Sequence, residues 1–483
     1  MNDLLVAMER HAEERPDAVA VRAFSRGAWT DTSWRQLVTL VQKAASGVRL
    51  PREHARVLLV LDNSAHAVAV LLGLLRAGAD VICVERDNSH LGDARSVLRQ
   101  VDVGALITCD DAGHPTGSAS ADLPFARYSY ADLLSGSPGE TSRPAAAGTA
   151  TVHQLTSGST GEPRIVRHAA TSIERGGAIY RDIFGYRPVD RVLLPVPQAH
   201  SFGMVGGVVA GLLSGAGIVL LDTFSLTAVH SALADGVTVM LGTPLVYRLL
   251  AAAPPPPDNR LRLALSSGGP LSPDLADAAE RTLGLRVSQV YGSTETGIIA
   301  FQPPRAEPWP AQAVGIAAPG VTWQAGPEGL VVTTSTMFTG YLEPGGVTPS
   351  GAADGYAIGD LARIDDGVLY LTGRKDTFIN VGGRKVNPAR VGRIVLAQPD
   401  VRDVHVFALD SPSGEQEVHA AVVAPAEEAA RITAHCRDRL ARYEVPRLHF
   451  VARLPRSALG KVDLSRLLAE LPSAAPSRLP ETP

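Results

Sequence analysis

Apolar runs alternate with amphipathic stretches along the chain as far as Tyr291. Residues 57–61 and 80–85 are short runs typical of buried strands, and the apolar stretch 65–77 between them predicts a helix that ends before Gly78. Strand-like and helix-like stretches keep this order through residues 287–291. The alternation predicts βαβ units, and therefore a mainly parallel sheet covered by helices.

The same periodicities place the other elements of this first part of the chain. Further strands are expected at residues 18–23, 105–108, 152–155, 191–196, 217–221, 238–241 and 263–266. Further helices are expected at residues 94–100, 170–184, 204–213, 244–252 and 273–283. Residues 135–149 are rich in Ser, Pro, Gly and Ala, which predicts a loop or linker.

Short alternating runs lie between glycines from residue 301 to residue 373, which favours a small antiparallel barrel or sheet. After Arg374 the pattern predicts strands at 404–409 and 418–423 and a helix at 427–443. We therefore expect an α/β protein with a large N-terminal core (residues 1–373) that includes a β-barrel-like subdomain (residues 301–373). A small mobile α+β domain (374–471) and a disordered tail (472–483), rich in Pro and Ser, are expected to follow.

Composition and charge narrow the classes of function. Hydrophobic residues make up 45% of the 483 positions, enough for a sizeable core, and the net charge of -4 gives no footprint for nucleic acid or an anionic membrane. Cys83, Cys109 and Cys436 lie far apart, without metal-ligand or disulfide spacing, which suits a reducing cytoplasm. Glycines interrupt the longest apolar stretch, 203–221, so we expect a buried helix and strand rather than a membrane span, and no secretory signal is visible.

Residues 155–164, Leu-Thr-Ser-Gly-Ser-Thr-Gly-Glu-Pro-Arg, concentrate glycines and hydroxyls after a predicted strand. Glycine lets the backbone approach a ligand closely, so N–H groups and hydroxyls can surround an anion, and Arg164 can add a planar fork for phosphate oxygens. The stretch is not a Walker A motif, because Pro163 stands where its second glycine would fall. On its own it fits a phosphate-binding loop and a flexible surface loop equally well.

Three later stretches turn this balance toward phosphate binding. They are Tyr-Gly-Ser-Thr-Glu-Thr-Gly at residues 291–297, Gly359-Asp360 with Gly-Arg-Lys-Asp at residues 373–376, and Gly460-Lys461-Val462. In order and spacing, the four stretches resemble the adenylate-forming superfamily, which comprises acyl- and aryl-CoA synthetases, nonribosomal peptide adenylation domains and luciferases. The resemblance covers nearly the whole chain, from about Asp17 to Leu468.

The resemblance implies ATP-dependent activation of a carboxylic acid to an acyl-adenylate, with release of pyrophosphate and with Mg²⁺ as a cofactor. Positive charge is needed in such a site because two anions approach each other. The superfamily usually has lysine at the position of Arg164 and glycine at that of Ile165; arginine keeps the charge with a different reach. The residues implied to bind the nucleotide are Thr156, Ser157, Gly158, Ser159, Thr160, Gly161, Arg164, Gly268, Gly269, Tyr291, Gly292, Ser293, Asp360 and Arg374.

Individual roles follow from the same resemblance. Tyr291 is expected to stack on adenine, Thr294 to touch the α-phosphate and Glu295 to hold magnesium, although residues 291–297 alone would also fit a tight turn. Asp360 is the expected partner of both ribose hydroxyls, since a carboxylate accepts two hydrogen bonds from a cis-diol.

The C-terminal stretches are implied to move and to complete the site. Arg374 corresponds to a ribose or phosphate contact and Asp376 to the domain hinge. Lys461 corresponds to a lysine that bridges the carboxylate and the α-phosphate. A lysine on a mobile domain can serve adenylation and then withdraw so that a thiol can enter.

The acid-binding end is implied by a further match to superfamily segments that line the acyl pocket. His200 either hydrogen-bonds the carboxylate, gates the pocket or is a structural histidine. Amino-acid-activating relatives carry an aspartate just past this point, but residues 201–205 contain no acid. A buried ammonium would lack a partner there, so we expect an acid without an α-amino group. The pocket residues are His200, Ser201, Phe202, Gly203, Ser267 and Gly268.

The acceptor of the acyl group stays open between two thiols. CoA is favoured; the alternative is the phosphopantetheine of a separate acyl carrier protein, because no carrier-type serine motif follows Lys461. A catalytically inactive adenylate-binding protein is a third option, against which Glu295, Asp360 and Lys461 argue, and nothing selects a luciferase-like oxygenase. We expect a small-molecule carboxylic acid as substrate, no nucleic acid or membrane span, a cytoplasmic location, and a homodimer as one option for assembly.

Overall fold

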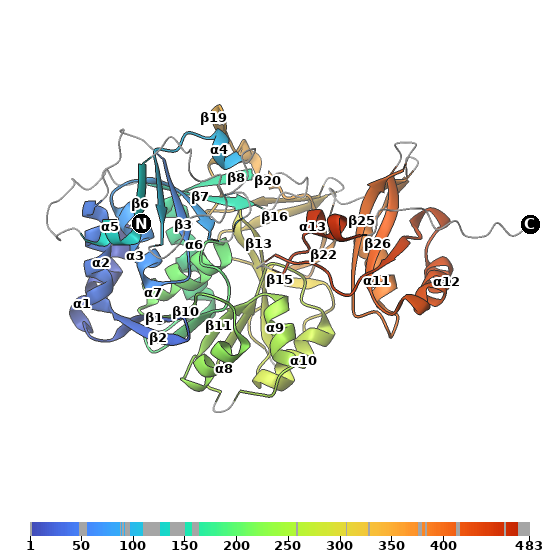
Figure 1. Ribbon diagram of the computed structural model, residues 1–483, viewed down its shortest axis with the longest axis horizontal. Helices are drawn as coiled ribbons and strands as arrows, with labels where there is room; N and C mark the ends of the chain where they lie inside the picture. The colour runs from blue at the N-terminus through green and yellow to red at the C-terminus, as the bar shows by residue number, and fades with distance from the viewer. Residues whose placement is uncertain are drawn as a thin grey trace, which may run out of the picture. The chain divides into compact units, whose positions relative to one another are not determined.

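The chain forms two compact units (Figure 1). Unit 1 consists of Met1–Ala325, Leu330–Ile358 and Arg363–Leu371, and unit 2 of Gly326–Gly329, Gly359–Ala362 and Thr372–Pro483. The large α/β part and the small α+β part confirm the expected fold class. The mobility expected of residues 374–471 stays a prediction. The computed structural model describes residues 2–47, 56–86, 88, 91, 97–109, 126–135, 150–156, 164–256, 259–305, 307–326, 329–374, 379–381, 384–411, 416–457 and 460–471, so the expected disorder of the tail lies outside it.

One sheet of unit 1 has eight described strands in the order β19-β18-β8-β7-β4-β3-β5-β6. From β7 to β6 neighbouring strands run parallel, and β8, β18 and β19 continue the sheet with antiparallel pairs. Apolar runs predicted β3, β4 and β5, whereas the polar β6 shows no such run. The strands are β3 (Arg56–Leu61), β4 (Asp80–Glu85), β5 (Ala105–Thr108), β6 (Ala126–Ser129), β7 (Thr151–Thr156), β8 (Arg164–Ala169), β18 (Gly340–Glu343) and β19 (Gly346–Pro349).

A second sheet has eleven described strands in the order β2-β1-β10-β9-β11-β12-β13-β14-β15-β22-β21. The strands from β1 to β13 in this order are parallel, and antiparallel pairs follow from β13 to β22. The strands are β1 (Val19–Ser25), β2 (Ala28–Ser33), β9 (Arg191–Leu194), β10 (Gly217–Leu221), β11 (Val239–Gly242), β12 (Leu263–Ser266), β13 (Val287–Ser293), β14 (Gly297–Phe301), β15 (Ala313–Ala317), β21 (Asp360–Asp365) and β22 (Val368–Arg374).

The β-rich residues 301–373 therefore contribute strands to both large sheets. A further small sheet in the same region has the order β16-β17-β20. Its strands are β16 (Thr322–Gly326), β17 (Gly329–Thr333) and β20 (Tyr356–Ala357).

Helices cover the sheets of unit 1 because the apolar faces of both kinds of element need burial. Helices α8, α9 and α10 share one apolar core with the parallel strands of the eleven-stranded sheet (Figure 1). Helix α3 is buried from Ala67 to Leu75, since it contacts strands of both large sheets. The helices are α1 (Asn2–Glu14), α2 (Trp34–Gly47), α3 (Ala65–Arg76), α4 (Val97–Gln100), α5 (Tyr130–Leu134), α6 (Ala170–Phe184), α7 (Ala210–Ser214), α8 (Leu226–Ala234), α9 (Pro244–Ala251) and α10 (Pro273–Leu283).

The apolar stretch 203–221 is a buried helix followed by a strand, as expected. The π-helix η3 (Phe202–Val209) continues into α7, and β10 follows. Gly206 and Gly207 lie so close to Tyr180 and Leu194 that a Cβ on either glycine would overlap those side chains. Tight packing therefore explains these glycines. No helix within the described ranges is long and apolar enough to cross a membrane.

Unit 2 is built on the sheet β25-β26-β27, whose two faces carry different helices. One face packs with α11 and α12 in an apolar core. The other face packs with α13, through a cluster that includes Phe407, Ala421, Leu454 and Leu467. The elements are β23 (Ile379–Val381), β24 (Arg384–Val386), α11 (Pro388–Leu396), β25 (Asp403–Asp410), β26 (Gln416–Val423), α12 (Ala429–Arg439), β27 (Arg447–Phe450) and α13 (Leu464–Glu470).

The helix expected at residues 427–443 is shorter in the structure. Helix α12 ends at Arg439, because Leu440 has extended backbone angles (φ -121°, ψ 148°). The buried carboxylate of Glu444 accepts a hydrogen bond from the Ala441 N–H at 2.9 Å, which stabilises a separate short turn after the break. Amphipathic spacing alone overestimated the length of this helix, since it is insensitive to such local hydrogen bonds.

Candidate functional site

The glycine-rich stretch connects two antiparallel strands. Thr156, the last residue of β7, pairs with Arg164, the first residue of β8. Both predicted ligands that frame the stretch therefore stand side by side. The other predicted phosphate ligands lie outside the described residues; they are Ser157, Gly158, Ser159, Thr160 and Gly161.

Tyr291, Gly292 and Ser293 end β13, and a tight turn leads from them into β14. The hydroxyls of Ser293 and Thr296 lie 3.1 Å apart, and each also accepts a hydrogen bond from the other residue's N–H at 3.3 Å. A Cβ on Gly292 would overlap the Gly297 carbonyl, so only glycine fits this close approach of two strands. Gly292 and Ser293 therefore shape the turn, whatever else they contact.

The turn that follows, residues 294–296, is held by three donors on three consecutive backbone carbonyls. The ring of His168 donates to the first at 2.7 Å, the Phe338 N–H to the second at 2.8 Å and the Thr336 hydroxyl to the third at 2.6 Å. His168 lies on β8, and the other two donors lie just before β18. Elements of the eight-stranded sheet thus fix the backbone that carries the predicted α-phosphate and magnesium ligands.

Glu295 and Arg164, the last residue of the glycine-rich stretch, both contact Tyr341 on β18. The Tyr341 hydroxyl donates to Glu295 Oε1 at 3.2 Å and lies 2.7 Å from the Tyr356 hydroxyl. The guanidinium carbon of Arg164 lies 3.4 Å from the centre of the Tyr341 ring, in a cation–π contact. Phe338 packs edge-on against both tyrosine rings. Two motifs that are distant in sequence therefore converge on one side chain.

Both tyrosines of this cluster stay protonated at neutral pH. Burial raises the pKa of Tyr341, and the hydrogen bond with Tyr356 and the charge of Glu295 raise it further. Burial and the charge of Glu295 also raise the pKa of Tyr356. An ionised carboxylate only accepts hydrogen bonds, so Tyr341 donates to Glu295 and its own oxygen accepts from Tyr356. This chain of donors orients the Glu295 carboxylate.

We expect Tyr341→Phe to lower the rate of adenylate formation about tenfold, because a hydrogen bond to a charged group contributes about 1.5–3 kcal/mol. The phenyl ring keeps the contacts with Arg164 and Phe338, so the fold should be unaffected. The Mg²⁺ dependence of pyrophosphate exchange measures the effect. Tyr370→Phe is the matched control, since Arg363 on β21 lies 3.7 Å from the centre of the Tyr370 ring on β22 in another cation–π contact. Equal rates for the two variants would contradict the orienting role.

His168 makes the stability of this region depend on pH. Burial lowers the pKa of His168 to about 4, from 6.5. The folded protein therefore binds this proton less readily than the unfolded chain, so the stability is complete above pH 6.5 and falls as the pH decreases toward 4. Between pH 7 and pH 5, protonation of His168 should lower the free energy of unfolding by about 2 kcal/mol. We expect this loss to be absent in His168→Gln, whose amide can still donate to the Thr294 carbonyl.

Thermal or urea unfolding at these two pH values measures this difference. His66→Gln is the control, because His66 is an exposed histidine on α3 and takes no part in the contacts that hold the turn after β13. An undiminished pH dependence in His168→Gln would show that another group causes the loss.

Two buried amides, one on β7 and one just after β3, fix the predicted acid-binding segment, residues 197–203. Gln154 on β7 accepts a hydrogen bond from the Ser201 hydroxyl at 2.6 Å and donates to the Ala199 carbonyl at 2.8 Å. Asn63, two residues after β3, accepts from the Gln198 N–H at 2.8 Å. The segment also follows β9 of the other sheet, so it lies at the carboxyl ends of parallel strands from both sheets. Ligands of open α/β sheets bind at such ends.

His200 contacts the carboxylate of Glu85, the last residue of β4. A carboxylate therefore lies beside the predicted acid pocket. It comes from the end of β4, whereas the sequence was searched for a carboxylate only at residues 201–205. Phe202 packs against Tyr180, and Gly203 is buried where a Cβ would overlap the Pro197 carbonyl. The absence of an α-amino group in the substrate stays a prediction.

Ser267, Gly268 and Gly269 follow β12, and Gly268 has the positive φ of 88° that favours glycine. Beside them, the buried hydroxyls of Thr243 and Ser266 have no hydrogen-bond partner among the residues that the structure describes. Buried hydroxyls without partners are costly, so polar ligand groups or water are expected to complete them. Small residues and buried hydroxyls without a described partner therefore lie together at this part of the predicted acid pocket.

In unit 2, two residues predicted to contact the nucleotide pair with each other. Arg374 Nε lies 2.8 Å from Asp360 Oδ1, and the side chain of Asp360 is only 13% exposed. Lys461 is exposed on a turn that a Ser457 N–H bond to its carbonyl closes at 2.8 Å. The predicted hinge Asp376 lies outside the described residues.

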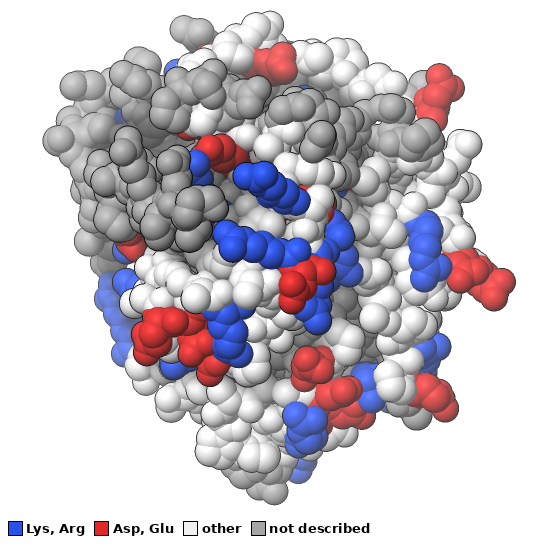
Figure 2. Space-filling view, turned by 90° about the vertical axis from the view of Figure 1, so that its right-hand side faces the viewer, with Lys and Arg blue, Asp and Glu red and all other residues white. Residues whose placement is uncertain are grey.

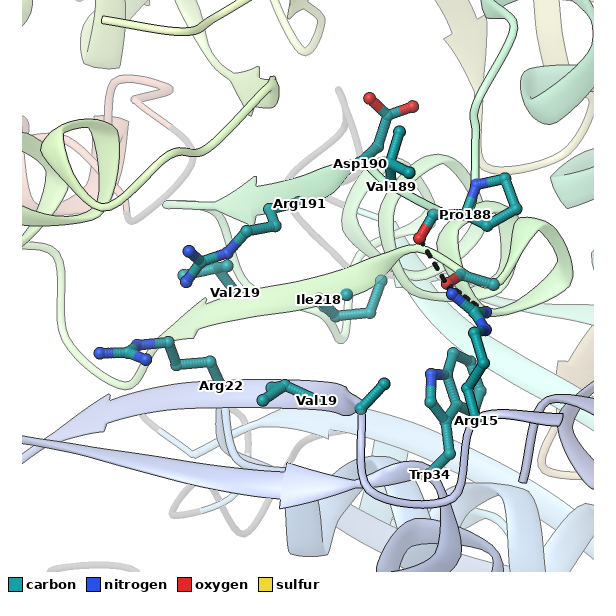
Figure 3. Close-up of a pocket in the computed structure, with 13 residues that line it drawn as sticks. Arg15, Val19, Arg22, Trp34, Pro188, Val189, Asp190, Arg191, Ile218 and Val219 are labelled. Atoms are coloured by element: carbon teal, nitrogen blue, oxygen red, sulfur yellow. Dashed lines mark hydrogen bonds between the residues drawn. The ribbon is translucent and has the colours of Figure 1, made fainter. Parts of the chain in front are cut away.

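A cavity of about 270 Å³ lies in unit 1, away from all predicted site residues. Figure 3 shows Arg15 at one end, where it donates to the carbonyls of Pro188 at 3.2 Å and Gly215 at 3.0 Å, and Arg22 and Arg191 toward the other end. The cavity adjoins the first residues of β1, β9 and β10. The cavity is therefore at the amino ends of parallel strands, whereas the predicted acid-binding segment lies at their carboxyl ends.

Glu295 stays the predicted metal ligand, and the described residues form no cluster of ligands. No group of three or more His, Cys, Asp or Glu within them could hold a metal ion. Burial raises the pKa of Cys83 to about 12 and that of Cys436 to about 11, so neither thiol is a nucleophile. On the face in Figure 2, Lys and Arg side chains are interspersed with Asp and Glu rather than gathered into one basic patch.

Sequence reasoning missed Glu85, His168, Tyr341 and Tyr356. Glu85 carries a usable signal, because it is a charged residue at the carboxyl end of an apolar parallel strand. The other three act through long-range contacts, such as the pairing of β18 with β8, that no local pattern predicts.

Comparisons with known proteins agree with this geometry. Residues 8–326 match the family described as AMP-binding enzyme, and residues 391–461 match the family described as AMP-binding enzyme C-terminal domain. The chain is 31% identical to 2-succinylbenzoate–CoA ligase of Bacillus licheniformis, over 64% of this chain and 67% of that protein. It is 27% identical to indoleacetate–CoA ligase of Aromatoleum aromaticum, over 96% of this chain and 97% of that protein.

A solved structure shares the fold over nearly the whole chain. ATP-bound MatB from Rhodopseudomonas palustris superimposes with a TM-score of 0.81 at 21% identity, over 96% of this chain and 98% of that chain.

Proposed function

We propose, because this chain belongs to the AMP-binding enzyme family, that it activates a carboxylic acid with ATP and then transfers the acyl group to the thiol of CoA. A carboxylate oxygen attacks the α-phosphorus of ATP, pyrophosphate leaves, and an acyl-adenylate forms. The CoA sulfur then attacks the acyl carbon and releases AMP. The resemblance drawn from the four motifs is confirmed at the level of the family.

The observation that carries the proposal is the meeting of Arg164 and Glu295 at Tyr341. One is the cation at the end of the glycine-rich stretch, and the other is the carboxylate of the turn after β13. A triphosphate needs a cationic contact and a metal ligand within one short span. Their shared tyrosine supports a single phosphate site built from both motifs.

Five of the predicted site residues have a proposed task in the first step. Glu295 would hold Mg²⁺ together with phosphate oxygens, and the ion would neutralise charge on the leaving diphosphate; a single protein carboxylate suffices, since Mg²⁺ keeps waters and phosphates as its other ligands. Arg164 would leave the Tyr341 ring for a phosphate oxygen, and Thr294 would donate to the α-phosphate. Lys461 would neutralise the approaching carboxylate. Asp360 would accept hydrogen bonds from the ribose.

The acid is proposed to lack an α-amino group. Residues 201–205 offer no carboxylate, and the one that stands near them, Glu85, contacts His200. The acids in the names of the relatives, 2-succinylbenzoate and indoleacetate, lack an amino group as well. Ser201 is bound to Gln154, so His200 is the residue of this segment proposed to meet the acid.

CoA is the proposed acceptor, since the relatives named above are CoA ligases. Loading of the phosphopantetheine of a separate acyl carrier protein is the alternative that the same chemistry permits. The first step is identical for both acceptors, so only the second step separates them.

Exchange of labelled pyrophosphate into ATP tests the first step. A panel of benzoate, phenylacetate, malonate, butyrate, octanoate and phenylalanine covers aryl, short-chain, medium-chain and amino acids. We expect exchange with at least one acid that lacks an amino group, and none with phenylalanine. Exchange with no acid at any Mg²⁺ concentration would favour a nucleotide-binding protein without catalysis, and exchange with phenylalanine would overturn the proposed acid class.

For the acid that exchanges fastest, mass spectrometry after addition of CoA identifies the acceptor. A product heavier than CoA by the acyl group supports the CoA step. Exchange without an acyl-CoA product, together with acylation of a phosphopantetheine-loaded carrier protein, would favour the alternative.

A further inference from the structure

The turn that carries Lys461 is fixed by backbone pairing within unit 2. Arg456 and Val462 form an antiparallel bridge. The Ser457 N–H donates to the Lys461 carbonyl at 2.8 Å, so the chain runs back beside itself. After the turn, the Asp463 carboxylate accepts from the Arg466 N–H at 3.0 Å and caps α13. The backbone on the C-terminal side of Lys461 is therefore anchored to a helix.

A guanidinium anchors the other side of the turn to the sheet. Arg456 Nη1 donates to the Gly460 carbonyl at 2.7 Å, and Arg456 Nη2 lies 2.5 Å from Asp403 Oδ2. Asp403 is the first residue of β25, and its other oxygen accepts from the Val404 N–H at 3.0 Å. The side chains of Arg456 and Asp403 are 27% and 24% exposed. Such partly buried, hydrogen-bonded ion pairs hold their geometry better than fully exposed ones.

The bond to Gly460 acts on the peptide that precedes Lys461. Gly460 has a φ of 79°, and glycine adopts positive and negative φ about equally well, so a contact to the Gly460 carbonyl adds to the backbone pairing in selecting this conformation. Fixing the Gly460 carbonyl fixes the plane of the peptide that joins it to Lys461. That plane sets the direction in which the Lys461 side chain leaves the turn.

We propose that Arg456, held in place by Asp403, is a positioning residue that orients Lys461 for adenylate formation. The inference rests on the proposed function, because it has a consequence only if Lys461 acts at the carboxylate and the α-phosphate. A lysine is a point charge on a flexible stem, so its backbone must be fixed if its ammonium is to reach one place. Misplacement by about 1 Å can cost on the order of 100-fold in rate. Arg456 would not affect thioester formation, which does not use Lys461.

Two variants test the proposal, with the panel acid that exchanges fastest. We expect Arg456→Gln and Asp403→Asn each to slow pyrophosphate exchange about tenfold or more, with the KM for ATP nearly unchanged. Thioester formation from preformed acyl-adenylate should be unchanged. Arg456→Lys keeps one of the two contacts and should recover part of the rate. Arg447→Gln is the matched control, since Arg447 pairs with Glu417 at 2.8 Å on the same sheet but away from the turn.

A double variant separates positioning from a general structural effect. If Arg456 acts through Lys461, Arg456→Gln should cause no further loss of exchange in a Lys461→Ala background. A further tenfold loss there, or an equal loss of both half-reactions, would overturn the proposal. Thermal unfolding shows which variants are folded, and Arg456→Lys and Asp403→Asn carry the test if Arg456→Gln is not.

The same measurements distinguish failure of this inference from failure of the proposed function. If Lys461→Ala slows exchange but neither Arg456→Gln nor Asp403→Asn does, only the positioning role is wrong. If Lys461→Ala itself leaves exchange unchanged, the assignment of Lys461 is wrong and the positioning role falls with it.

Discussion

Lys461→Ala is expected to slow acid-dependent pyrophosphate exchange by about 100- to 1000-fold, the cost of removing one well-placed electrostatic contact to a transition state. Two anions meet when the carboxylate approaches the α-phosphate, and the ammonium would neutralise the charge that builds up between them. Thioester formation from preformed acyl-adenylate should stay close to the rate of the unmodified protein, because the attack of a thiol on the acyl carbon needs no such neutralisation. Separate assays of the two half-reactions measure the difference.

Lys43→Ala is the matched control, since Lys43 lies on α2, far along the chain from every predicted site residue. It should leave both half-reactions unchanged. Equal losses in both half-reactions for Lys461→Ala would contradict the expectation that the lysine serves adenylation and withdraws before the thiol enters.

Glu295→Gln is expected to lower the rate of adenylate formation by about 100-fold or more, because the amide keeps the size of the side chain but loses the charge that binds Mg²⁺. The amide oxygen can still accept the hydrogen bond from Tyr341, so the cluster around Arg164 should stay folded. Metal binding supplies a readout that does not depend on turnover. Binding of Mn²⁺ in the presence of ATP, followed by electron paramagnetic resonance, should weaken in the variant.

Glu280→Gln serves as the control for this variant. Glu280 pairs with Arg286 at 2.6 Å on the surface of α10, so its loss removes a carboxylate without touching the turn after β13. If Glu295→Gln binds Mn²⁺ and exchanges pyrophosphate as well as Glu280→Gln does, the metal ligand lies elsewhere.

The strands and helices of the first part of the chain were predictable because each is a local signal. Buried parallel strands such as β3 and β4 are continuous apolar runs, and the apolar helix between them is long enough to be distinguished from a strand. The same logic failed at α12, where the buried carboxylate of Glu444 stabilises a break that hydrophobic spacing does not show.

The candidate site was predictable only as a set of motifs. Glu295 and Arg164 could be named from sequence, but their meeting at Tyr341 depends on β18 pairing with β8, a contact between residues far apart along the chain. The pairing of His200 with Glu85 likewise depends on the end of β4 lying next to a segment that follows β9. Glycines were ambiguous for a related reason: Gly292 and Gly207 are explained by close packing, which sequence cannot distinguish from close approach to a ligand.

The transfer of one carboxylate oxygen to AMP is the most direct test that a carboxyl oxygen displaces pyrophosphate at the α-phosphorus of ATP. The acid that exchanges fastest is labelled with ¹⁸O in both carboxylate oxygens and converted with ATP and CoA, and the products are weighed by mass spectrometry. We predict one ¹⁸O in AMP and the other in the thioester. Unlabelled AMP, or the label in inorganic phosphate together with ADP, would contradict adenylate formation.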